Sequence, residues 1–134
     1  MLSPHDIQKK KTIVVVEDDD DFRWLVLKML GGLESFPVEL IGAVDGRSGI
    51  EAIRRCSPDL VILDLGLPDM NGWEVFMVMR AAPDSARIPV IILSSEGTRV
   101  DRSFGLQVAQ VHDYLVKPCL PSRLRQSVVT ALAD

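Results

Sequence analysis

Short runs of apolar, mostly β-branched residues alternate with helical spacing along the chain, and this alternation constrains the fold most. The runs cover 12–16, 38–44, 60–63, 88–93 and 113–116. Two of them, 12–16 and 60–63, are apolar on both faces, which is typical of central parallel strands covered by helices on each side. The segment 38–44 is expected nearer an edge. Strands that alternate with helices predict βα units in an open, doubly wound parallel sheet with right-handed connections.

The segments between these runs carry helical signals. The first helix has an apolar stripe that starts at Phe22, Asp20 or Asp21 can cap it, and Gly31-Gly32 marks its end. Further helices are predicted over 47–56, 72–80, 99–108 and 121–133, and in 99–108 one apolar side is expected. That side comprises Val100, Phe104 and Val108.

Length and composition limit the classes of protein. The chain has 134 residues, which fits one domain, and we expect a flexible N-terminal arm over 1–11 and the domain over 12–134. A formal charge of −4 argues against a nucleic-acid surface. Because Cys56 and Cys119 lack a CxxC spacing, they are expected to be unpaired thiols. No secretory signal and no membrane-length apolar run is evident, so a cytoplasmic protein without membrane contact is expected.

Polar side chains directly follow four of the five predicted strands. In a parallel sheet the carboxyl ends of the strands share one edge, which is where ligands of such sheets bind. The polar groups are Glu17, Asp18 and Asp19 after the first strand, Asp64 after the third, Ser94 after the fourth and Lys117 after the fifth. We therefore expect one site built from these groups.

These residue types suit a metal-assisted phosphoryl transfer. Clustered carboxylates repel one another unless a cation neutralises them, and ligand sets made only of oxygen favour hard cations such as Mg²⁺ or Mn²⁺. Lys117 and Ser94 can contact phosphoryl oxygens as a charge and as a hydroxyl donor. Asp64 can act as a covalent nucleophile toward phosphorus.

Four segments, each at a predicted strand end, are similar to the successive signatures of response-regulator receiver domains. They are Val-Val-Val-Glu-Asp-Asp at 14–19, Leu-Asp-Leu-Gly-Leu-Pro-Asp-Met-Asn-Gly at 63–72, Ile-Ile-Leu-Ser-Ser at 91–95 and Asp-Tyr-Leu-Val-Lys-Pro at 113–118. The resemblance extends over about residues 12–132. It implies the flavodoxin-like strand order 2-1-3-4-5, with helices on both faces of the sheet.

The resemblance also implies roles for individual residues. Asp64 would be the phosphoacceptor and also a metal ligand, and Asp18 would bind the metal directly. Glu17 would hold a metal-bound water, and the backbone carbonyl of Gly66 would be a further metal ligand.

Signalling roles follow from the same resemblance. Ser94 and Lys117 would contact the phosphoryl group, Ser94 and Tyr114 would form the switch, and the Lys117-Pro118 bond would be cis. The donor would be a sensor histidine kinase or a histidine phosphotransfer protein. Output would use the face formed by the fourth helix, fifth strand and fifth helix. No enzyme activity is expected beyond self-phosphorylation and slow self-dephosphorylation.

Three alternatives remain beside this interpretation. A degenerate receiver, acting only as an interaction module, would usually lack the acceptor Asp or the Lys, and this chain has both. An aspartate-based phosphatase would carry a second acid two residues after the nucleophile, where this chain has Gly66. A flavin-binding domain would need a glycine- and hydroxyl-rich loop after the first strand, but 17–21 is acidic.

Overall fold

The sheet is parallel throughout, with the order β2-β1-β3-β4-β5, as predicted. The computed structural model describes residues 10–33, 37–95 and 102–133. The strands are β1 (Lys11–Val16), β2 (Val38–Ala43), β3 (Leu60–Leu63), β4 (Val90–Ser94) and β5 (Asp113–Val116). The strand predicted nearer an edge, β2, forms one edge of the sheet. Of the predicted N-terminal arm, residues 1–9 lie outside the described residues.

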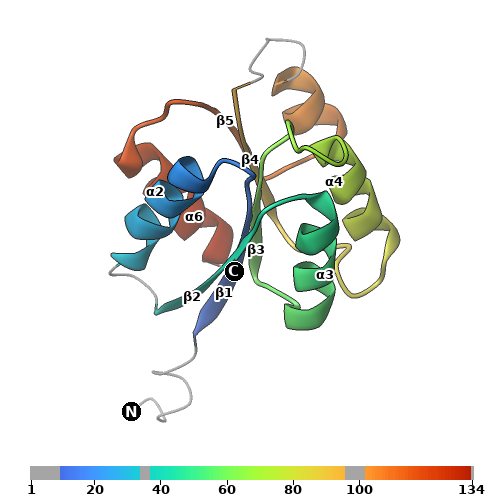
Figure 1. The fold of residues 1–134 in the computed structure, drawn as a ribbon, viewed down its shortest axis with the longest axis horizontal. Helices are drawn as coiled ribbons and strands as arrows, with labels where there is room; N and C mark the ends of the chain where they lie inside the picture. Colours follow the sequence, from blue (N-terminus) through green and yellow to red (C-terminus); the bar gives the residue numbers. More distant parts are fainter. Residues whose placement is uncertain (1–9, 34–36, 96–101, 134) are drawn as a thin grey trace.

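Helices cover both faces of this sheet (Figure 1). Their bounds are α2 (Asp20–Gly31), α3 (Gly46–Cys56), α4 (Gly72–Ala81), the π-helix η1 (Phe104–Val108) and α6 (Pro121–Leu132). Figure 1 shows α2 and α6 on one face, and α3, α4 and the orange segment that contains η1 on the other. This arrangement confirms the doubly wound architecture.

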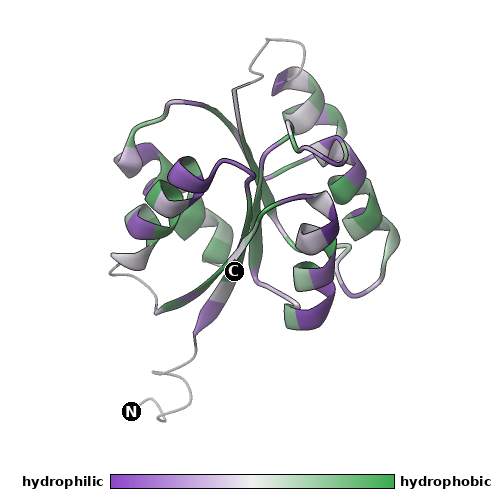
Figure 2. Ribbon diagram, viewed as in Figure 1, coloured by the Kyte–Doolittle hydropathy of each residue, from purple (hydrophilic) through white to green (hydrophobic). Residues whose placement is uncertain are grey.

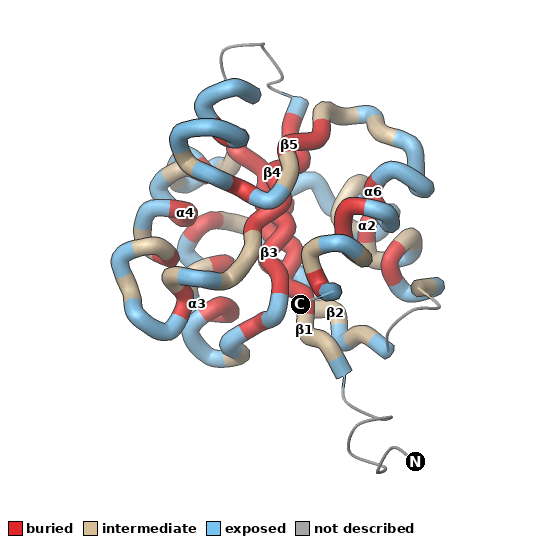
Figure 3. The backbone as a smooth tube through the Cα atoms, turned by 180° about the vertical axis from the view of Figure 1, so that it is seen from behind, coloured by how far each residue is buried: buried red, intermediate tan, exposed pale blue. Residues whose placement is uncertain are grey.

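Two apolar layers hold the helices against the sheet, and β1 contributes to both. Ile13 and Val15 belong to the layer with α2 and α6, whereas Val14 and Val16 belong to the layer with α3 and α4. All four side chains are at most 1% exposed. Because successive side chains of a strand point to opposite faces, a run that is apolar at every position is buried on both. Figures 2 and 3 show this buried, apolar centre.

The cap of α2 differs from the prediction. Asp19, not Asp20 or Asp21, is the N-cap, and its side chain accepts a hydrogen bond from the Phe22 N–H at 3.0 Å. Asp19 has extended backbone angles, whereas the two following aspartates already lie in the first helical turn. An N-cap must be the last non-helical residue, so the cap lies before both of the predicted positions.

The predicted helix at 99–108 is also different. Residues 99–101, including Val100, lie outside the described residues, and 104–108 forms a π-helix. The expected apolar side is wrong, because Phe104 and Val108 are 44% and 70% exposed. Gly105 faces inward instead, and a Cβ there would lie 2.9 Å from Cδ2 of Tyr114. The Tyr114 ring packs closely on the backbone of Gly105, which has no side chain, and this contact decides which face of η1 is buried.

Two smaller observations complete the fold. Cys56 and Cys119 are unpaired, as predicted. Within the described part of the chain, no helix combines the length and apolarity needed to cross a bilayer.

Candidate functional site

Backbone hydrogen bonds between adjacent strands align the strand ends that carry the predicted site residues. The Asp64 N–H donates to the Val16 carbonyl at 3.0 Å, which places Asp64 beside the start of the acidic segment. The Lys117 N–H donates to the Ser94 carbonyl, also at 3.0 Å. The parallel register thus brings all four predicted strand ends to one edge of the sheet.

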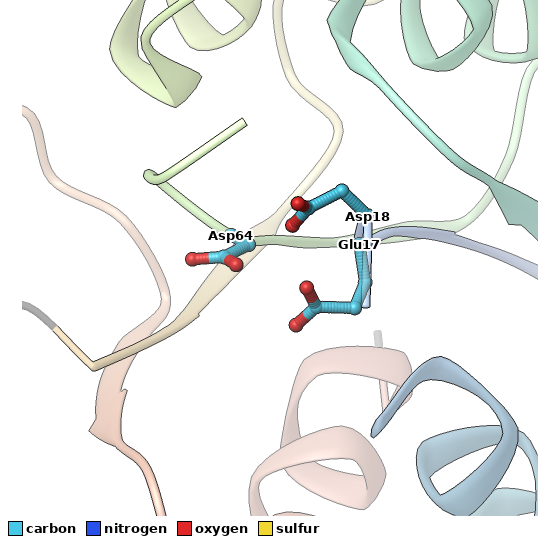
Figure 4. Close-up of side chains that lie close together, drawn as sticks. All are labelled: Glu17, Asp18 and Asp64. Atoms are coloured by element: carbon cyan, nitrogen blue, oxygen red, sulfur yellow. The ribbon is translucent and has the colours of Figure 1, made fainter. Parts of the chain in front are cut away.

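Three carboxylates converge at this edge (Figure 4). Glu17, Asp18 and Asp64 each offer an oxygen, and these oxygens all lie within 4.8 Å of one another. Glu17 is 3% exposed and Asp64 is 6% exposed, while Asp18 is open to solvent. Two buried carboxylates beside a third are costly unless positive charge balances them.

Lys117 supplies part of that charge. Its Nζ donates to Oε1 of Glu17 at 2.5 Å and to Oδ2 of Asp64 at 3.1 Å. The same Nζ lies 4.3 Å from the ring centroid of Phe22, on α2, a cation–π contact. The following Lys117-Pro118 bond is cis, as the resemblance implied. One ammonium therefore bridges two buried acids.

The pKa values of these groups move in different directions. Burial raises the pKa of Glu17 to about 7, although Lys117 and the Asp19 N–H favour its ionised form. Burial also opposes the ionisation of Asp64, but the Gly66 N–H and the Lys117 charge outweigh it, so the pKa of Asp64 is lowered. Asp64 is thus the stronger acid of the buried pair, and its lowered pKa makes it a carboxylate anion at neutral pH.

The two predicted switch residues are both buried. Ser94 is fully buried at the end of β4, and Tyr114 is 1% exposed in the core. Tyr114 contacts Gly105 of η1. The switch role itself stays a prediction.

The loop after Asp64 folds tightly back on the strand end. The Gly72 N–H donates to the Leu65 carbonyl at 2.8 Å, and Gly66 and Asn71 form an antiparallel bridge. Gly66 N–H donates to Oδ1 of Asp64 at 3.2 Å. Asp69 fastens the loop to α3, since its carboxylate accepts hydrogen bonds from the first two N–H groups of that helix.

The sequence did not single out three residues that shape this site. They are Phe22 beneath the Lys117 ammonium, Gly72 against the Asp64 backbone, and Arg23, whose guanidinium contacts the Glu17 carbonyl. An arginine two residues after an acidic segment is a weak signal, because such a residue is usually a solvated helix side chain.

The donor set fits a hard divalent cation. The possible ligand atoms of Glu17, Asp18 and Asp64 are all oxygens. Two of these carboxylates, Glu17 and Asp64, are buried, and both contact the same ammonium, that of Lys117. Mg²⁺ typically takes one or two carboxylates and keeps water or phosphate oxygens as its other ligands. A cation at this edge would also favour the ionised form of Glu17.

Asp18→Asn is expected to raise the thermal unfolding midpoint of the metal-free protein, because it removes one of three mutually repelling charges. In wild type, MgCl2 at about 100 times its Kd should add about 2.7 kcal/mol of stability by linkage. The variant should lose most of that gain. Asp84→Asn, at an exposed carboxylate outside the cluster, is the control and should behave as wild type. Calorimetric unfolding with and without MgCl2 measures both effects, and an unchanged Mg²⁺ gain in Asp18→Asn would contradict the assignment.

Comparisons with known proteins agree with this fold. The chain belongs to the response regulator receiver domain family, which it matches over residues 13–129. It is therefore a receiver domain of the kind found in two-component signalling.

The chain matches only part of the length of its curated relatives. The regulatory protein LuxO of Vibrio cholerae is 36% identical over 96 residues, which are 71% of this chain and 20% of that protein. The DNA-binding response regulator MtrA of Mycobacterium tuberculosis is 42% identical over 91 residues, 68% of this chain and 37% of MtrA. The chain thus matches only a fifth to two fifths of these relatives.

Solved structures match over nearly the whole chain. The signal receiver domain of a putative LuxO repressor from Vibrio parahaemolyticus has a TM-score of 0.82 and 31% identity, covering 93% of this chain and 92% of that one. The receiver domain of the sensor histidine kinase PA1611 from Pseudomonas aeruginosa has a TM-score of 0.81 and 25% identity, covering 94% and 100%. That structure has a magnesium ion coordinated in its active-site cleft.

Proposed function

We propose that residues 12–134 form a phosphorylation-dependent receiver that accepts a phosphoryl group on Asp64 with the help of Mg²⁺ or Mn²⁺. The observation that carries this proposal is the position of Asp64. It is a buried carboxylate with a lowered pKa, it contacts the Lys117 ammonium, and it lies beside two further acids. The magnesium ion in the PA1611 receiver domain supports a divalent cation at this kind of site.

In the proposed reaction a carboxylate oxygen of Asp64 attacks the phosphorus of a phosphohistidine. The new O–P bond forms as the P–N bond breaks, and the imidazole leaves with that electron pair. Lys117 and the Ser94 hydroxyl contact phosphoryl oxygens. Asp18, Glu17, Asp64 and the Gly66 carbonyl would hold the cation. A bound cation supplies charge neutralisation, the main requirement of phosphoryl transfer. The donor is a sensor histidine kinase or a histidine phosphotransfer protein.

The product is expected to be hydrolysed slowly. Rapid hydrolysis needs an acid–base group beside the acyl phosphate, and an acid two residues after the nucleophile would serve. That position is Gly66, which is exposed and has no side chain. We therefore infer a signalling module whose only chemistry is its own phosphorylation and dephosphorylation.

Output is proposed to use the face formed by η1, β5 and α6. Tyr114 of β5 lies directly against Gly105 of η1, so a change around Ser94 and Tyr114 would reach that helix first. Val108 of η1 is 70% exposed and offers apolar surface to a protein partner, whereas the Phe104 ring packs edge-on against Trp73 of α4. The formal charge of −4 supports a protein rather than a nucleic acid.

A small phosphodonor tests the chemistry without a kinase. Wild type incubated with MgCl2 and phosphoramidate should gain the mass of one phosphoryl group, in an adduct that is stable in acid and labile in base. Asp64→Asn should gain none, and Asp84→Asn should react as wild type. Intact-mass spectrometry follows all three. The absence of an adduct on wild type would favour the alternative, a degenerate receiver that acts as a phosphorylation-independent interaction module.

A further inference from the structure

Arg23, in the first turn of α2, reaches back to the segment that leaves β1. Its Nη1 donates to the Glu17 carbonyl at 2.8 Å, and its Nη2 donates to Oδ1 of Asp20 at 2.6 Å. The Arg23 side chain is only 17% exposed, whereas that of Asp20 is 83% exposed. The guanidinium therefore ties the first residue after the strand to the first residue of the helix.

Strand β2 provides the surface on which this side chain lies. A Cβ built on Gly42 would be 3.1 Å from Cδ of Arg23 and 3.5 Å from its Nε. Glycine inside a strand costs about 0.5–1 kcal/mol relative to alanine, so its presence here is consistent with a need for space. Gly42 leaves room for the arginine stem to cross the edge of the sheet.

The Glu17 carbonyl that Arg23 holds belongs to the peptide group joining Glu17 to Asp18. A peptide group is planar, so fixing its oxygen also fixes the direction in which the chain continues on either side. Glu17 and Asp18, the two residues on either side of this peptide group, carry two of the three carboxylates of the cluster. We propose that Arg23 is a positioning residue for the metal site, acting through this peptide group, with Gly42 as its packing surface. The inference rests on the proposed function.

The simpler interpretation is that Arg23 only forms a surface ion pair with Asp20. The ion-pair interpretation and the positioning role predict opposite changes in Mg²⁺ affinity when the charge of Arg23 is removed. If Arg23 acted only through its charge, removing that charge would strengthen Mg²⁺ binding, because a cation would no longer repel the metal. If Arg23 positions the carboxylates, removing it weakens binding. Mutation of a residue that orients metal ligands typically lowers metal affinity by about 10–100-fold.

Calorimetric titration of the whole chain with MgCl2 alone measures this sign. Arg23→Gln should bind Mg²⁺ about tenfold more weakly than wild type. Arg23→Lys keeps the charge but has one nitrogen in place of the two that contact the Glu17 carbonyl and Asp20, so it should also bind Mg²⁺ more weakly. Asp20→Asn removes only the exposed ion pair and should stay within about twofold, since such pairs contribute little. Equal or tighter binding by Arg23→Gln or Arg23→Lys would overturn the proposal.

Gly42→Ala separates positioning from general stability. The added methyl would lie 3.1 Å from Cδ of Arg23, so the stem must move by a few tenths of an ångström, and this should weaken Mg²⁺ binding. The unfolding midpoint should stay equal or rise, because alanine costs less than glycine in a strand. Gly31→Ala, where a Cβ meets nothing within 4 Å, is the matched control. In metal-free protein, the Asp18 amide resonance should shift in Arg23→Gln and Gly42→Ala but not in Gly31→Ala. Wild-type Mg²⁺ affinity in Gly42→Ala would contradict the proposal, even if Arg23→Gln failed to fold.

These outcomes also separate the two proposals. If wild type binds no Mg²⁺, the proposed function fails, and the positioning role fails with it. If wild type binds Mg²⁺ and accepts a phosphoryl group while the Arg23 and Gly42 variants bind Mg²⁺ as tightly, only the positioning role fails.

Discussion

Lys117→Met is expected to lower the free energy of unfolding of the metal-free protein by about 2 kcal/mol. The ammonium contacts both Glu17 and Asp64, which are almost completely buried. Removing one partner of a fully buried pair typically costs about 3–5 kcal/mol, and the Lys117 side chain is still 18% exposed, so the expected cost is smaller. Urea unfolding in a chelating buffer measures it.

MgCl2 should restore much of this loss, because the cation neutralises the same carboxylates. The Mg²⁺ affinity itself should rise, since the ammonium no longer competes for them. Phosphorylation by phosphoramidate should nevertheless slow about 100-fold, the usual cost of losing one charge-stabilising contact. Lys117→Arg keeps a positive charge and is the control for stability. A Lys117→Met variant as stable as wild type without metal would show that the two acids do not depend on this ammonium.

Gly72→Ala is expected to lower the free energy of unfolding by about 3 kcal/mol, at the upper end for overpacking. A Cβ at this position would lie 2.3 Å from the Asp64 carbonyl oxygen and 2.7 Å from Cα of Leu65. Both are backbone atoms in a buried strand end, so no flexible side chain can move aside. The loop must therefore shift, and Asp64 with it.

The consequence for function is a weaker site as well as a less stable fold. Gly72→Ala should bind Mg²⁺ more weakly and label more slowly with phosphoramidate than wild type. Gly31→Ala in α2 is the control, because its Cβ meets no atom within 4 Å and alanine is the better helix former. Urea midpoints of both variants check the prediction. Equal midpoints for Gly72→Ala and wild type would contradict the close approach of 72 to the Asp64 backbone.

Much of the fold could be predicted because its signals are local. An unbroken apolar run such as 60–63 is compatible with burial on both faces, and the strand found there is completely buried. The predicted bounds of β5 agree with the structure, and those of β3 agree as well. The predictions that were wrong concern details of the backbone and of contacts that the local sequence pattern does not encode. The inward position of Gly105 depends on the Tyr114 ring, and the cap of α2 depends on where the backbone angles become helical at Asp19.

The convergence of the site residues could also be predicted from the sequence. Parallel strands end at one edge, so polar groups at the carboxyl ends of β1, β3, β4 and β5 must approach one another. The phosphoacceptor, metal-ligand, phosphoryl-contact and switch roles assigned to individual residues of this site all stay predictions.

What the sequence by itself determined is the order of the strands' polar ends and the chemistry they offer: carboxylates, a hydroxyl and an ammonium. What only the tertiary structure decided is how these groups are held. Lys117 contacts Glu17 across a separation of 100 residues, Arg23 crosses Gly42 to hold the Glu17 carbonyl, and Gly72 closes on Asp64. The reason is physical: periodicity and strand ends are properties of neighbouring residues, whereas these contacts depend on close approaches between segments that the chain brings together only on folding.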